Sequence, residues 1–145
     1  MDEPVLDDLA AGGGPRRERA ARAADAIRAA TGCRWVGIYT VAGGTVTNEA
    51  WSGPAAPAHP MFADTQGLTA HAVRTGSVAL SNDVARDPRY LTNQDDSGSE
   101  LIVPVLVGGR VVGTLDVESG AVGAFDGAAV ARFERLAEAL HPLWA

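Results

Sequence analysis

Two valine-rich runs joined by Gly108-Gly109 constrain the fold of this chain more than any other feature. The segment from Ser99 to Ser119 reads SELIVPVLV, then GG, then RVVGTLDVES. Glycine tolerates the positive φ of a tight turn, so the pattern predicts two antiparallel strands joined by a two-residue turn. Because the runs are apolar on both strand faces, we expect both faces to be covered.

Three carboxylates lie near the open end of this predicted hairpin. Glu100 comes at the start of the first run, and Asp116 and Glu118 come at the end of the second. A carboxylate in or beside a buried strand costs free energy unless another group pairs with it. The open end of the hairpin is therefore a candidate floor for a binding pocket.

The register of the hairpin decides which carboxylates can meet. An ideal ladder from the Gly-Gly turn pairs Leu101 with Asp116, so Asp116 and Glu118 share a face while Glu100 points to the other. Pro104 lacks the N–H that a regular ladder needs, and proline is common at bulges. We therefore expect an irregularity between Glu100 and Pro104 that brings all three carboxylates into one pocket.

Length and composition favour one globular domain. The chain has 145 residues, of which 46% are hydrophobic and 21% charged, and this length suits a single core. No run is long enough to span a bilayer, and no basic-then-apolar signal pattern opens the chain. We therefore expect a cytoplasmic protein without a membrane partner. The net charge of −6 repels phosphate backbones and disfavours nucleic acid as a partner.

Cysteine and histidine give no sign of a metal or cofactor site. The single cysteine, Cys33, excludes an intrachain disulfide and a cysteine-based metal site; we expect it to be a small buried hydrophobe rather than a reactive thiol. His59, His71 and His141 are scattered without ligand spacing, and we expect surface or capping roles for them. The sequence thus predicts neither a metal nor a cofactor.

The order of elements predicts an α+β fold with a central antiparallel sheet. Residues 1–14 are acidic and then glycine-rich, which predicts a flexible tail before a single domain over 15–145. The domain is expected to contain, in order, a helix over 16–30, strands over 34–41 and 45–51, a helix over 68–74, a strand over 77–80, the hairpin, and a helix capped by Asp126. Hairpins make antiparallel sheets, so we expect the terminal helices on one face and the loops with the short helix on the other.

The residues then resemble a GAF domain, a ligand-binding α+β module, over about residues 15–140. Four stretches carry the resemblance, and their order and spacing are more specific than any one of them: WVGIY from Trp35, GLTA from Gly67, NDV to DPRY from Asn82, and ELIVP from Glu100 with VGTLD from Val112. The resemblance implies a GAF-like sheet with a ligand pocket on one face.

Within that superfamily the chain is most similar to the free methionine-(R)-sulfoxide reductases, which are small stand-alone GAF proteins. Trp35 and Tyr39 resemble the aromatic residues of their first strand, and Glu100, Asp116 and Glu118 resemble their pocket carboxylates. In that family the carboxylates receive the substrate's ammonium and sulfoxide, and the aromatics wall its side chain. The resemblance therefore implies that these five residues bind a ligand.

Two positions depart from the reductases. The family has a cysteine where this chain has Thr69, and its attacking cysteine where this chain has Asn93. Neither side chain can form the sulfenic acid and disulfide that this reduction needs. We therefore expect a family-like pocket without the family's reaction, and we assign no catalytic residue.

Three functions remain open from the sequence. The first is a non-catalytic, sensor-type protein that binds an amino acid or amine, since carboxylates beside aromatic rings attract a cation. The second is a divergent free methionine-(R)-sulfoxide reductase. The third is a dimerisation module with a vestigial pocket. Binding or signalling also needs an interface, so we expect a homodimer through the terminal helices.

Overall fold

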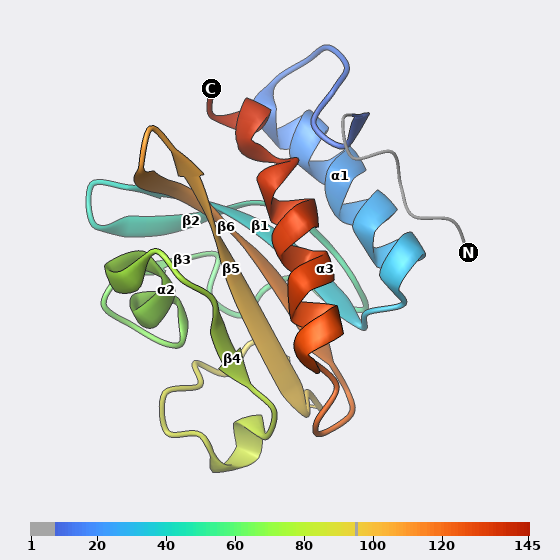
Figure 1. Ribbon diagram of the computed structural model, residues 1–145, viewed down its shortest axis with the longest axis vertical. Coiled ribbons are helices and arrows are strands. Elements are labelled where there is room, and N and C mark those ends of the chain that lie inside the picture. The colour runs from blue at the N-terminus through green and yellow to red at the C-terminus, as the bar shows by residue number, and fades with distance from the viewer. Residues whose placement is uncertain (1–7, 95) are drawn as a thin grey trace.

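The computed structural model describes residues 8–94 and 96–145, and its ribbon is an α+β fold built on an antiparallel sheet (Figure 1). The strands are β1 (Trp35–Ala42), β2 (Thr45–Ser52), β3 (Met61–Ala63), β4 (Ala79–Ser81), β5 (Ser99–Val107) and β6 (Arg110–Ser119). The helices are α1 (Arg16–Thr31), α2 (Thr69–Thr75) and α3 (Gly127–Glu138), with short 3-10 turns η2 (Val84–Arg86) and η3 (His141–Leu143). The strand order is β3-β2-β1-β6-β5-β4, which confirms the predicted fold class.

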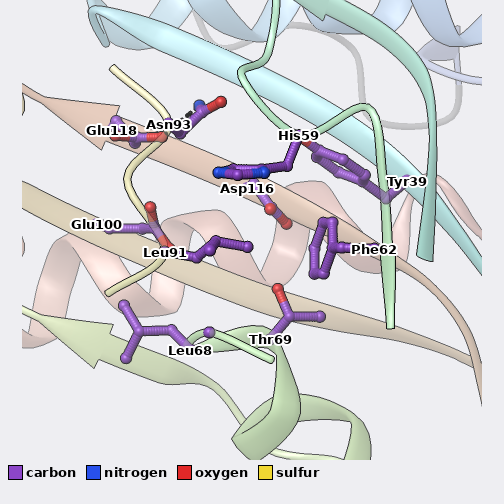
Figure 2. A pocket seen from close by; sticks show the side chains of 11 residues that line it. Tyr39, His59, Phe62, Leu68, Thr69, Leu91, Asn93, Glu100, Asp116 and Glu118 are labelled. Atoms are coloured by element: carbon purple, nitrogen blue, oxygen red, sulfur yellow. Dashed lines mark hydrogen bonds between the residues drawn. The ribbon is translucent and has the colours of Figure 1, made fainter. Parts of the chain in front are cut away.

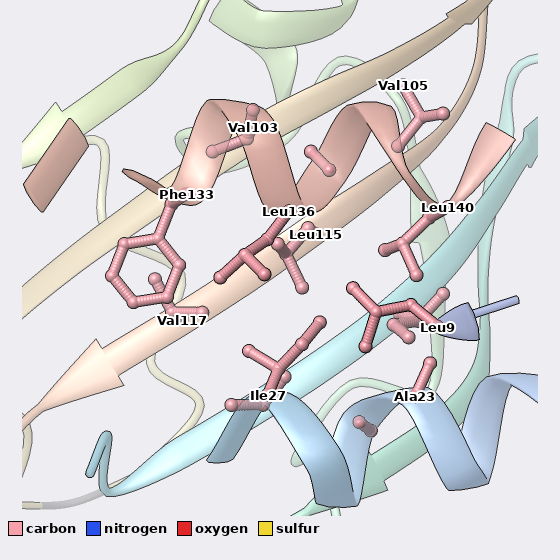
Figure 3. Close-up of a cluster of buried hydrophobic side chains, with 14 of the residues drawn as sticks. Leu9, Ala23, Ile27, Val103, Val105, Leu115, Val117, Phe133, Leu136 and Leu140 are labelled. Carbon is pink, nitrogen blue, oxygen red and sulfur yellow. The ribbon is translucent and has the colours of Figure 1, made fainter. Parts of the chain in front are cut away.

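The terminal helices α1 and α3 lie side by side on one face of the sheet, as predicted (Figures 1 and 3). Ile27 of α1 and Leu136 of α3 are fully buried there against Leu101 and Leu115 of the hairpin. Because these apolar faces meet, the helix side of the sheet is the main core. The opposite face, which carries α2 and the long loops, is left for the candidate pocket.

Local sequence explains where the two long helices begin and end. Pro15 stands at the N-cap of α1, and Gly32 ends the helix with φ 71°, donating its N–H to Arg28 O, as expected of a glycine C-cap. Asp126 caps α3, where its side chain accepts a hydrogen bond from Ala129 N at 2.8 Å. These caps agree with the start and stop signals that the sequence carries.

The hairpin has the predicted turn, but its bulge is in another place. Gly108 and Gly109 adopt φ of 59° and 77°, as a tight primed turn requires. The ladder is regular from Ser99 to Val105, and the register shifts between Val105 and Leu106. The expected irregularity between Glu100 and Pro104 is therefore wrong.

The extra residue is Val112, on the second strand, because Val105 pairs with Gly113 while Leu106 pairs with Val111. Pro104 can occupy β5 because strand β4 does not reach it. The last β4–β5 pair joins Ala79 to Ile102, so no hydrogen bond to β4 requires an N–H at position 104. The shifted register still has the predicted consequence, since it turns Glu100 to the same face as Asp116 and Glu118.

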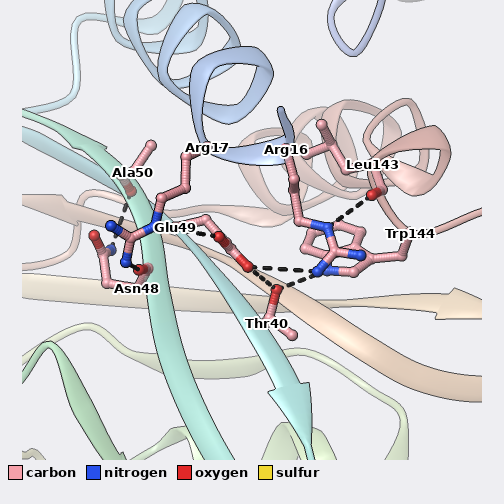
Figure 4. A network of polar contacts seen from close by, with 8 residues as sticks. All are labelled: Arg16, Arg17, Thr40, Asn48, Glu49, Ala50, Leu143 and Trp144. Carbon is pink, nitrogen blue, oxygen red and sulfur yellow. Dashed lines mark hydrogen bonds and ion pairs between the residues drawn. The ribbon is translucent and has the colours of Figure 1, made fainter. Parts of the chain in front are cut away.

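The two ends of the domain are tied to the sheet by polar contacts (Figure 4). Trp144 donates its indole N–H to Thr40 Oγ1 at 2.8 Å, and Thr40 donates to Glu49 at 2.5 Å. Arg16 donates to Leu143 O at 2.9 Å and lies 3.6 Å from Glu49. This network fixes the start of α1 and the C-terminal turn to β1 and β2.

The segment before α1 differs from the tail expected over residues 1–14. Leu9 and Ala10 are buried in the core, and Arg19 donates two hydrogen bonds to Ala10 O. The first seven residues lie outside the described part of the chain. The tail prediction therefore does not hold at Leu9 and Ala10.

The outer faces of the terminal helices are polar. Exposed positions include Arg17 and Arg22 on α1 and Glu134 and Arg135 on α3. The homodimer through these helices stays a prediction, and a sedimentation experiment that finds only monomer would contradict it. Among the described residues, no helix combines the length and apolar character that crossing a membrane requires.

Candidate functional site

Strand pairing brings the three predicted carboxylates together on the face opposite α1 and α3. Glu100 pairs directly with Glu118, and Ile102 pairs with Asp116 two positions closer to the Gly108-Gly109 turn. Residues that pair across an antiparallel ladder share a face, as do alternate residues along one strand. Glu100, Asp116 and Glu118, here called the carboxyl cluster, are all at least nine-tenths buried.

The carboxyl cluster forms one wall of a pocket between the sheet, α2 and the long loops (Figure 2). The space outside protein atoms at this site is about 340 Å³ when its open mouth and the solvent in it are counted. The lining residues are Tyr39, His59, Phe62, Gly67, Leu68, Thr69, Leu91, Asn93, Glu100, Asp116 and Glu118.

Glu118 is held by donors from the loop before β5. Its carboxylate accepts hydrogen bonds from the Tyr90 hydroxyl at 2.8 Å, from Asn93 Nδ2 at 2.6 Å, and from the Ser97 hydroxyl. Hydrogen bonds to a charged acceptor are the stronger kind, and they offset its desolvation. Glu118 is therefore well satisfied before any ligand arrives.

Asp116 is in the opposite situation. Its Oδ1 atom is buried without a hydrogen-bond partner among the described residues, and so is Oγ1 of the neighbouring Thr114. Burial, with a smaller contribution from the negative charge of Glu118, raises the pKa of Asp116 to about 7. The Thr114 side chain acts in the opposite direction and lowers this pKa in part.

Glu100 is also shifted toward its neutral form. Burial raises the pKa of Glu100 well above its ordinary value, and the charges of Glu118 and Asp116 act in the same direction. A hydrogen bond between the Glu100 and Glu118 side chains adds to the effect. Two carboxyls in contact favour one shared proton, because like charges at that distance repel strongly.

Of the two aromatic residues predicted to line the pocket, only one does so. Tyr39 lines the pocket, but Trp35 is fully buried behind it and does not line the cavity. The Trp35 indole crosses Gly37, where an added Cβ would lie 2.3 Å from the ring, and its N–H donates to Ala55 O at 3.0 Å. Trp35 therefore supports the pocket wall instead of facing a ligand.

Replacing Gly37 with alanine should disturb this wall. The new Cβ has no room beside the buried Trp35 ring, so we expect Gly37→Ala to destabilise the fold by ~1–3 kcal/mol, as overpacking does. Chemical denaturation measures the change. Gly127→Ala is the matched control, because a Cβ there meets nothing within 4 Å. Equal stabilities of the two variants would contradict the assigned packing.

Several pocket residues were missed because they come from loops or from the short edge strand β3. His59, Phe62 and Leu91 line the cavity from segments without periodic patterns, although His59 was expected only to lie at the surface or cap a helix. Thr69 and Asn93 also line it. These are the two positions that the sequence matched to reductase cysteines, so the resemblance was the only signal for them.

Cys33 lies away from the pocket. It is partly buried between α1 and β1 and packs against the main core, as predicted. Burial raises the pKa of its thiol, although the Thr31 hydroxyl and the charges of Arg132 and Arg28 oppose the rise. In the described part of the chain, no three histidine, cysteine, aspartate or glutamate side chains are arranged to hold a metal ion.

The chain belongs to the GAF domain family, whose model matches residues 16–141. GAF domains are a small-molecule-binding and signalling fold. A comparison with curated protein sequences found no match.

Solved structures of similar fold include reductases and other GAF proteins. The type II free methionine-R-sulfoxide reductase of Thermoplasma acidophilum is 26% identical with a TM-score of 0.83, covering 95% of this chain and 94% of that one. The free methionine-R-sulfoxide reductase of Neisseria meningitidis, solved with its substrate, is 25% identical with a TM-score of 0.86, covering 97% and 84%. A putative GAF sensor protein of Burkholderia vietnamiensis is 23% identical with a TM-score of 0.81, covering 93% and 85%, and that likeness concerns the fold alone.

Proposed function

We propose that the protein binds a small organic cation, an amino acid or an amine, in the pocket beside the carboxyl cluster, and does so without catalysis. The observation that carries this proposal is Asp116 Oδ1, a buried carboxylate oxygen that has no hydrogen-bond partner among the described residues. A buried polar atom of this kind is costly unless a ligand completes it. An ammonium group supplies both the charge and the donor that Asp116 lacks.

The rest of the pocket lining supports a cation. No arginine lines the pocket, and the chain contains no lysine, so the exposed His59 is the one described lining side chain that can carry a positive charge. Tyr39 and Phe62 stand opposite Asp116 with ring centroids 6.0 Å apart (Figure 2). Aromatic faces attract a cation and also cover the apolar part of its body.

The three carboxylates would then have different roles. Asp116 is the group that contacts the ligand's ammonium, because its oxygen is free. Glu118 is a positioning group, since Tyr90, Asn93 and Ser97 already occupy its carboxylate. Its charge still favours a cation nearby, without a direct contact.

Thermal-shift measurements with matched probes test the proposal. We expect methionine-(R)-sulfoxide or isoamylamine to raise the melting temperature, because a ligand of the folded state stabilises it by mass action. Their counterparts without an ammonium group, N-acetylmethionine sulfoxide and isoamyl alcohol, should not. Stabilisation by these two compounds to the same extent would contradict recognition of an ammonium.

The variant Asp116→Asn locates the binding group. Loss of one charged hydrogen-bond partner costs ~1.5–3 kcal/mol, so we expect affinity for the cationic probe to fall about 10- to 100-fold. Asp25→Asn is the matched control, because Asp25 is exposed on α1 and far in the fold from the pocket face. Unchanged binding by Asp116→Asn would show that the pocket assignment is wrong.

A divergent free methionine-(R)-sulfoxide reductase is the second candidate, and the likeness to two such enzymes at 26% and 25% identity favours it. Reduction of a sulfoxide by a thiol leaves a sulfenic acid that a second thiol resolves. This chain has one cysteine, and Cys33 does not line the pocket. Turnover of methionine-(R)-sulfoxide with a thioredoxin or glutaredoxin reductant would overturn the non-catalytic proposal.

A further inference from the structure

The three side chains of the carboxyl cluster lie so close together that, without a ligand, at least one of them should carry a proton. Glu100 and Glu118 are directly opposite each other in the ladder, and Asp116 is one pair further along the same face. All three are buried. Three ionised carboxylates in such a space repel one another strongly, because the surroundings screen charge poorly.

The neighbouring groups do not supply a compensating positive charge. The titratable side chains around the cluster are Tyr39 on β1, His59 in the loop before β3, and Asp87 and Tyr90 in the loop before β5. Asp87 is already paired with Arg89 at 2.7 Å. His59 is the one lining side chain among the described residues that can become cationic, and it is exposed.

Donors to the cluster are also unevenly shared. The loop hydroxyls and amide all converge on Glu118. Glu100 has a hydrogen bond with Glu118, which requires a proton on one of the two. Asp116 Oδ1 receives no donor from the described residues.

We propose that the pocket exchanges a proton for its cation: Asp116 is partly protonated when the pocket is empty at neutral pH and gives up that proton when an ammonium group arrives. This inference rests on the proposed function and adds its thermodynamic coupling. Atoms and charge balance, since one proton leaves the carboxyl for solvent as one positive charge enters the pocket. Glu100 keeps its proton, because its hydrogen bond to Glu118 persists.

The size of the coupling follows from the Asp116 carboxyl, whose pKa burial raises to about 7. Proton release per bound cation should be close to one at about pH 5.5, about one half at about pH 7, and near zero at about pH 8.5. Binding should correspondingly tighten about 30-fold between about pH 5.5 and about pH 8.5. Titration of the probe does not contribute to this change in affinity, because an alkylammonium such as isoamylamine stays charged to about pH 10, as lysine does.

Isothermal titration calorimetry with isoamylamine and methionine-(R)-sulfoxide measures both quantities. Affinity is recorded across the pH range, and proton release is obtained from paired titrations in two buffers of different ionisation enthalpy. Glu100→Gln should keep the pH dependence, because it leaves Asp116 to titrate. Infrared spectroscopy of the unliganded Glu100→Gln variant, which lacks the Glu100 carboxyl, should detect a protonated carboxyl at neutral pH that is lost as the pH rises through about 7.

The outcomes separate this inference from the proposed function. Binding that tightens with pH together with matching proton release supports both. Binding with the same affinity at every pH, or no protonated carboxyl at neutral pH in the unliganded protein, overturns the exchange and leaves cation binding intact. No saturable binding of either probe at about pH 8.5, where Asp116 is ionised, overturns the proposed function and the exchange together.

Discussion

The protein should become less stable as the pH rises from about 4 to about 7, opposite to the usual acid sensitivity of proteins. Burial raises the pKa of Asp116 in the folded protein from its ordinary value of 3.8 to about 7. Between these values the unfolded chain loses the proton while the folded protein keeps it, so unfolding is favoured by rising pH. The stabilising contribution is complete below about pH 4 and is lost as the pH passes about 7.

The expected change is ~4 kcal/mol, at ~1.4 kcal/mol for each pH unit between the two values. Glu100, whose pKa burial also raises, acts in the same direction. Asp87 acts in the opposite direction, because its hydrogen bonds from Arg89 lower its pKa. Its effect on the free energy of unfolding is confined to pH values below about 4, outside the range considered. Urea denaturation at a series of pH values measures the change.

The variant Asp116→Asn identifies the group responsible. It should flatten most of this pH dependence and make the protein more stable than wild type at about pH 8, because the amide carries no charge to bury. Asp25→Asn, at an exposed position on α1, should leave the profile unchanged. A wild-type stability that rises steadily from about pH 4 to about pH 7 would refute the assigned environment of Asp116.

Local patterns predicted the elements that local residues determine. The Gly108-Gly109 turn, the Asp126 cap and the alternation of Trp35 and Tyr39 on one face of β1 all follow from short-range rules. The hairpin acids were found because a carboxylate within an apolar strand is unusual. These features needed no knowledge of distant contacts.

Features that depend on distant contacts were placed wrongly or missed. The bulge lies at Val112 instead of near Pro104, and the adjacent Gly113 is packed against Trp144, to which an added Cβ would come within 2.4 Å. A contact between β6 and the end of the chain cannot be deduced from the hairpin's own sequence. Similarly, Phe62 reaches the pocket from the three-residue edge strand β3 and Leu91 from the loop before β5, and segments so short or irregular carry no periodicity that reveals this.

The donors around Glu118 should contribute as much to stability as a large core residue. Asn93 and Ser97 both donate to this buried carboxylate, and the double variant Asn93→Leu with Ser97→Ala removes these two donors while nearly preserving shape and leaves the Tyr90 donor in place. We expect a loss of ~3–5 kcal/mol in the free energy of unfolding, because a buried charge that loses partners costs more than a neutral group. Thr92→Val, at an exposed position in the same loop, is the matched control.

A third substitution separates the charge effect from a general loss of packing. Adding Glu118→Gln to the double variant removes the charge that has lost two of its donors, so most of the lost stability should return, as a coupled pair in a mutant cycle requires. If packing alone were responsible, the triple variant would be no more stable than the double variant. Recovery would therefore mean that the loop before β5 is held over the pocket by its hydrogen bonds to Glu118, and that this carboxylate organises the site while Asp116 remains available to a ligand.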